Sequence, residues 1–131
     1  MHILIIRGNI ETPKSYPYWE ELLVLLKDHK IKEVKGMLQE KYIIELINWC
    51  DVWISIDSFI QHLVKYHKLK KGIVLWGKSN PEIFGYGDNI NLLKGPVNFR
   101  TDQFGKWSEV KHREEDFVLP EVILKEITNM L

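Results

Sequence analysis

Three short segments of this chain place polar or charged residues directly after apolar runs, where they could contact a ligand. Lys14 lies in the first segment, Asp57 and Ser58 lie in the second, and the third reads Gly-Lys-Ser at 77–79. A carboxylate accepts hydrogen bonds from hydroxyl groups, while lysine and backbone N–H groups bind phosphate oxygens. These residue types indicate a ligand that carries both sugar hydroxyls and phosphates. The candidates are Lys14, Asp57, Ser58, Gly77, Lys78 and Ser79.

The apolar run before Asp57 predicts the strand that would position it. Residues 52–56 read Val-Trp-Ile-Ser-Ile, as expected for a short strand buried on both faces. Ser58 followed three residues later by Gln61 matches a capping box, which predicts a helix that begins at Ser58. Asp57 would then lie between the carboxyl end of a strand and the N-terminus of a helix. Ligands of open α/β sheets bind at such strand ends, and helix N-termini favour anions.

Strand-like and helix-like segments alternate along the whole chain. We expect strands at 2–7, 31–36, 52–56, 73–76 and 89–94, and helices at 18–28, 38–50, 120–131 and from 58 to about 69. Residues 82–88 are expected to be irregular, and 96–117 to form a polar loop. This alternation predicts right-handed βαβ units and a parallel sheet covered on both faces. The predicted fold is one Rossmann-like α/β domain over residues 1–131, with three layers and about five parallel strands.

Composition narrows the possible partners. Eighteen basic residues balance eighteen acidic ones, which argues against a broad surface for nucleic acid or membrane. No apolar run approaches the ~20 residues of a membrane span. The single cysteine, Cys50, is expected in the core, and it indicates a reducing compartment, so we expect a cytoplasmic protein. The five histidines are scattered without the spacing of a metal site. No Gly-x-Gly-x-x-Gly turn or phosphate-binding P-loop is present.

Several segments, which follow one another along the chain in the same order as in the family, resemble one enzyme family. Segment 57–62, Asp-Ser-Phe-Ile-Gln-His, resembles the Asp-Ser-Gly-x-x-His pattern of the heptosyltransferase-like glycosyltransferases, family 9. Segment 75–81 resembles the Leu-Phe-Gly-x-Thr-x-Pro turn of that family. Lys14 with the following Pro-Tyr-Trp at 17–19 resembles its Lys-x-Trp-Pro loop. Segment 35–38 resembles the family's Gly-x-x-Leu entry to a helix, and segment 119–122 resembles the start of its closing helix. The likeness covers nearly the whole chain.

The resemblance implies the donor-binding C-terminal half of a two-domain GT-B fold. In that family this half holds a nucleotide-activated sugar, usually ADP-heptose, and no metal or other cofactor is expected. By resemblance, Asp57 and Ser58 would contact the sugar or diphosphate. The segment 77–79 would cradle phosphate and Lys14 would offset its charge. His62, one turn into the helix, would support the loop, although a histidine packed or hydrogen-bonded for structural reasons fits this position as well.

Three departures from the family pattern limit what the resemblance implies. The region between the first helix and Gly36 is short, as if one βα unit were missing. Phe59 stands where the family has glycine, so its side chain would either block the diphosphate or turn away. The acceptor-binding half, which supplies the family's catalytic base, has no counterpart here. Glycosyl transfer would therefore need a partner protein or a second copy of the chain, and no catalytic residue is assigned. The alternatives are a non-catalytic module that binds or sequesters a nucleotide, and a degenerate interaction domain in which Phe59 fills the former pocket.

Overall fold

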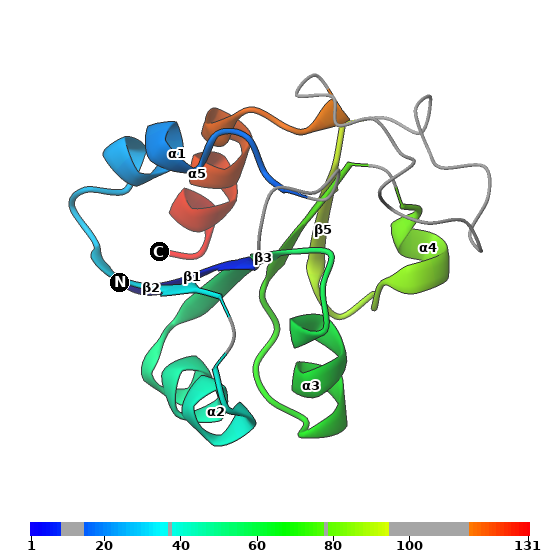
Figure 1. Cartoon of the computed structure of the whole chain (residues 1–131). Coiled ribbons are helices and arrows are strands. Elements are labelled where there is room, and N and C mark those ends of the chain that lie inside the picture. The colour runs from blue at the N-terminus through cyan, green and yellow to red at the C-terminus, as the bar shows by residue number, and fades with distance from the viewer. Residues whose placement is uncertain (9–14, 37, 78, 95–115) are drawn as a thin grey trace.

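A five-stranded parallel sheet forms the centre of the protein. The computed structural model describes residues 1–8, 15–36, 38–77, 79–94 and 116–131 (Figure 1). The strands lie side by side in the order β2-β1-β3-β4-β5, and every neighbouring pair is parallel. This confirms the predicted α/β class with five parallel strands. The strand bounds are β1 (His2–Gly8), β2 (Lys30–Lys35), β3 (Val52–Ile56), β4 (Ile73–Trp76) and β5 (Ile90–Leu93).

Helices cover both faces of the sheet and give the predicted three layers. α1 and α5 pack together on one face, whereas α2 and α3 lie on the other (Figure 1). The helix bounds are α1 (Trp19–Leu25), α2 (Glu40–Trp49), α3 (Ile60–Tyr66), α4 (Pro81–Phe84) and α5 (Pro120–Asn129). Pro120 occupies the first turn of α5, as expected, because proline lacks the N–H that is unused there. In the part of the chain described, no helix is long and apolar enough to cross a membrane.

Successive side chains of the central strands feed two separate cores. Ile3 and Ile5 of β1 face α1 and α5, while Leu4 and Ile6 face α2 and α3. This alternation follows from the two-residue period of a strand, and apolar residues at every position bury both faces. Cys50 lies in the second core, where burial raises the pKa of its thiol to about 11. The thiol is therefore protonated at neutral pH and serves as a core residue, as expected.

The structure corrects two local predictions. The helix after β3 begins at Ile60 and not at Ser58, and no side chain caps its N-terminus, so the predicted capping box is wrong. The residues expected to form it make other bonds, described below. The stretch predicted to be irregular begins with α4, because Asn80 caps that helix by accepting a hydrogen bond from the Glu82 N–H at 2.9 Å, and Pro81 fits its first turn. The predicted loop at 96–117 lies almost entirely outside the described residues.

Candidate functional site

The strand order places a topological switch point between β1 and β3. From β1 the chain leaves through α1 on one face towards β2, whereas from β3 it leaves through α3 on the opposite face towards β4. Ligands of open α/β sheets bind outside the carboxyl ends of the strands at this point. We call the carboxyl ends of β1, β3 and β4, with the residues directly after them, the rim.

The register of the sheet brings the predicted residues of the rim level with one another. Ile56 pairs with Leu75, so Asp57 lies level with the end of β4 and Ser58 with Gly77. On the other side of β3, Ile6 pairs with Ser55, and continuing that register brings the end of β1 level with Asp57. The structure therefore gathers the polar turns after β3 and β4 at one edge, as expected.

Gly8 closes β1 beside β3 and is a feature that the sequence did not single out. Its φ is +79°, in the left-handed region that favours glycine. A Cβ atom on Gly8 would also lie 3.0 Å from the Cδ1 atom of Ile56. Backbone geometry and close packing thus both favour a glycine here. The main chain of β1 consequently approaches the end of β3 closely at the switch point.

Asp57 follows β3 directly and is held by a buried amide from α3. The Gln61 side chain donates from Nε2 to Asp57 Oδ1 at 2.9 Å. Gln61 is only 1% exposed, and its Oε1 atom is buried with no hydrogen-bond partner among the described residues. Gln61 therefore fixes the orientation of the Asp57 carboxylate. The four-residue spacing of Asp57 and Gln61 is typical of a side-chain pair, but the sequence predicts that Gln61 belongs to a capping box.

Ser58 and Phe59 complete the turn after β3. The Ser58 hydroxyl lies 3.3 Å from that of Ser55, which itself donates to the Ile56 carbonyl at 2.8 Å. Phe59 has a φ of −63°, a right-handed helical value that needs no glycine. Its side chain is 51% exposed, so it does not fill a pocket in the protein interior. This exposure speaks against the alternative in which Phe59 fills a former pocket, whereas its effect on a diphosphate at the rim stays a prediction.

The turn after β4 has a packing explanation. A Cβ atom on Gly77 would lie 2.5 Å from Cζ of the buried Phe117, so only glycine lets that ring cover the end of β4. Ser79 is buried and directly precedes Asn80, the residue that caps α4. Both residues follow β4 at the rim, as predicted, but packing against Phe117 already accounts for Gly77 without a ligand.

His62 is further from the strand ends than the other described residues of the predicted site. His62 lies one turn into α3, where its Nδ1 atom is 2.8 Å from the Tyr86 hydroxyl and its ring packs edge-on against the tyrosine ring. It therefore ties α3 to the chain after α4, the structural role that was one of its two expected ones. Lys14 and Lys78 lie outside the described residues, so their predicted roles stay predictions.

Comparison of the chain with protein-family models, with curated proteins and with solved structures gave no match. The family resemblance therefore stays a prediction carried by the motifs and by their places in the fold. Among the described residues, no group of three or more His, Cys, Asp or Glu side chains could hold a metal ion.

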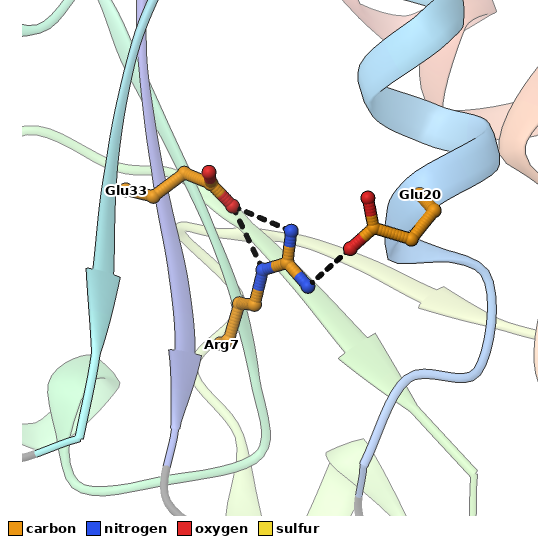
Figure 2. Close-up of polar contacts among 3 residues, drawn as sticks. All are labelled: Arg7, Glu20 and Glu33. Carbon is orange, nitrogen blue, oxygen red and sulfur yellow. Dashed lines mark hydrogen bonds and ion pairs between the residues drawn. The ribbon is translucent and has the colours of Figure 1, made fainter.

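A second charged group lies beside Gly8 and was not singled out from the sequence. Figure 2 shows that Arg7 reaches between Glu33 of β2 and Glu20 of α1. Its Nε atom donates to Glu33 at 2.8 Å and its Nη1 atom donates to Glu20 at 2.8 Å. Burial alone would lower the pKa of Arg7, but the two carboxylates outweigh it and raise the pKa. Arg7 is thus engaged in holding α1 and β2 at the end of β1, and it is not the cation that a phosphate at the rim would need.

Proposed function

We propose that the rim binds a nucleotide diphosphate sugar, as the donor half of a GT-B-like glycosyltransferase. The observation that carries this proposal is the position of Asp57: it follows β3 directly at the switch point, and a buried amide orients its carboxylate. A carboxylate fixed in this way is suited to accept hydrogen bonds from the hydroxyls of a ribose or a donor sugar. Sites that recognise sugar hydroxyls need such a preorganised acceptor.

The positions of the motifs support the same ligand class. Asp57 and Gly77, the central residues of the two best-matching family motifs, both directly follow strands of the sheet. The backbone at Gly8 and Gly77 and the hydroxyl of Ser58 lie at the same edge and would face the diphosphate. Lys14 and Lys78 would supply the countercharge. The helix after β3 has only seven residues, so the proposal does not depend on its dipole.

Calorimetric titration with ADP, UDP, GDP and their sugar conjugates tests the binding step. We expect one nucleotide and its sugar conjugate to bind the wild-type chain, and Asp57→Ala to weaken binding at least about tenfold, since a hydrogen bond to a charged group contributes ~1.5–3 kcal/mol. Asp28→Ala is the matched control, because Asp28 is an exposed carboxylate that precedes β2 at the opposite edge of the sheet. No binding of any of these nucleotides, or equal affinity in Asp57→Ala, would contradict the proposal.

A second measurement separates transfer from binding alone. A GT-B enzyme transfers the sugar in the cleft between its two halves, so the isolated chain should bind the donor without turning it over. Addition of a protein that supplies an acceptor half, or self-association of the chain, would be needed for sugar release onto an acceptor. If binding occurs but transfer is never reconstituted, the function is that of a nucleotide-sugar binding module, the principal alternative.

A further inference from the structure

A second pocket lies between α3 and the chain that connects α4 to β5, and Gln61, which holds Asp57 at the rim, is one of its lining residues. It has a volume of about 490 Å³, within the range of pockets that hold small organic ligands. The two segments run side by side on the α3 side of the sheet (Figure 1). Val64 and Leu69 supply apolar lining and Tyr86 an aromatic ring. We call this cavity the α3 pocket.

The charges that line the α3 pocket are predominantly positive. Its lining includes Lys65, Lys68 and Lys71 but a single carboxylate, that of Asp88. Lys65 binds Asp88 at 2.7 Å, and this contact lowers the pKa of Asp88 and raises that of Lys65. Lys68 and Lys71 make no ion pair with any residue of the described segments. Three ammonium groups against one carboxylate leave a surplus of two positive charges around the pocket.

Lys68 occupies a backbone position where glycine would be more favourable. Its φ is +53°, and it is the one non-glycine residue with a positive φ among those described. It ends α3 in a Schellman motif: the Leu69 N–H donates to the Val64 carbonyl at 3.0 Å, and the Lys68 N–H donates to the Lys65 carbonyl at 3.2 Å. Glycine is the usual residue at this point because it has no Cβ. Backbone preference therefore does not explain the lysine at this position.

We propose that the α3 pocket binds an organic phosphate, with the phosphate held by Lys68 and Lys71 and the organic part packed against Tyr86, Val64 and Leu69. Lysine ammonium groups bind phosphate oxygens through charge-assisted hydrogen bonds. The aromatic and apolar lining suits a flat or apolar body more than it suits a free inorganic ion. This second site does not depend on the function proposed for the rim.

Titration with phenyl phosphate, followed by amide chemical shifts, tests this proposal directly. We expect the shifts to concentrate on α3 and on residues 86–89, with inorganic phosphate binding more weakly and added salt weakening both. Lys68→Gly should lower the affinity for phenyl phosphate about tenfold, because it removes one charge-assisted contact. The same substitution should keep or raise the midpoint of thermal unfolding, because glycine fits the positive φ. Affinity and stability thus move in opposite directions.

A control variant on another face of the protein helps to locate the ligand. Lys125→Gln removes a lysine from the exposed side of α5, on the other face of the sheet, and should leave the affinity unchanged. The proposal is overturned if wild-type protein does not bind phenyl phosphate. It is equally overturned if Lys68→Gly with Lys71→Ser binds as tightly as wild type.

Discussion

The turns after β3 and β4 occupy neighbouring places on the sheet but are built differently. In the turn after β4, Phe117 packs over Gly77 and Asn80 caps α4, so each of these residues has a role in folding. In the turn after β3, the short helix begins without a side-chain cap, and Gln61 binds Asp57 instead. In the β4 turn, the polar side chain of Asn80 stabilises a helix. In the β3 turn, the polar side chain of Gln61 positions the Asp57 carboxylate.

This difference indicates which part of the rim is the better place to test for ligand binding. A capping side chain at the start of α3 would stabilise that helix by about 1 kcal/mol, yet the polar groups present there are directed elsewhere. Burial of the Gln61 amide with one oxygen lacking a partner among the described residues is also unfavourable. Local departures from the best folding choice concentrate at functional sites. The β3 turn is therefore the more informative place to look for binding, and the β4 turn the more sensitive place for stability.

The largest expected effect on stability is that of Gly77→Ala. The added methyl group would lie 2.5 Å from the Phe117 ring, well inside van der Waals contact, so the ring or the strand end must shift. Overpacking of this kind costs about 1–3 kcal/mol. Urea denaturation should show a lower midpoint with an unchanged slope.

A second substitution checks the cause of that loss. Phe117→Leu alone should destabilise the protein by leaving a cavity. Combined with Gly77→Ala it should cost less than the sum of the two single changes, because the smaller side chain makes room for the methyl group. If the two losses simply add, the contact between Gly77 and Phe117 is not what requires glycine after β4.

A smaller loss is expected when Asn80, the cap of α4, becomes alanine. The Asn80 Oδ1 atom accepts from the Glu82 N–H at 2.9 Å, and loss of such a cap costs ~1 kcal/mol. Asn80→Asp retains the acceptor oxygen and should stay close to wild type in the same denaturation experiment. Equal losses in both variants would mean that the side chain acts in some other way than as a cap.

The sequence predicted the strands and the main helices well because their signals are local. Apolar residues identified all five strands, although β2 has only Ile31 and Val34, and the runs of β3 and β4 placed Asp57 and Gly77 at strand ends. The contacts that distinguish the two turns are not local. The ring that covers Gly77 comes from Phe117, forty positions along the chain, and the approach of Gly8 to Ile56 depends on the strand order. No periodicity in the sequence encodes which strands become neighbours.

The start of α3 shows a different kind of failure. Ser58 and Gln61 have the spacing of a capping box, and Asp57 and Gln61 have the four-residue spacing of a side-chain pair. The two arrangements compete for one glutamine, and the sequence alone does not rank them. In the structure the pair with Asp57 forms, and the helix begins two residues later than predicted.

The smallest effect on stability is expected for Gln61→Met, and it is the sharpest test of the β3 turn. Methionine has a similar shape to glutamine but no polar atoms. The substitution loses the hydrogen bond to Asp57, but it also removes the buried amide oxygen that lacks a partner among the described residues, and the two effects offset each other. Replacement of buried polar groups by apolar ones of similar shape can be nearly neutral, and we expect the free energy of unfolding to change by no more than about 1 kcal/mol.

A double-mutant cycle measures the contact between Gln61 and Asp57. In the Asp57→Ala variant the glutamine has lost its partner, so Gln61→Met should be more favourable there than in the wild-type protein, by ~1 kcal/mol. Urea denaturation of the four variants gives this coupling energy without any ligand. A coupling near zero would mean that Gln61 does not hold the carboxylate, and the contrast between the two turns would disappear.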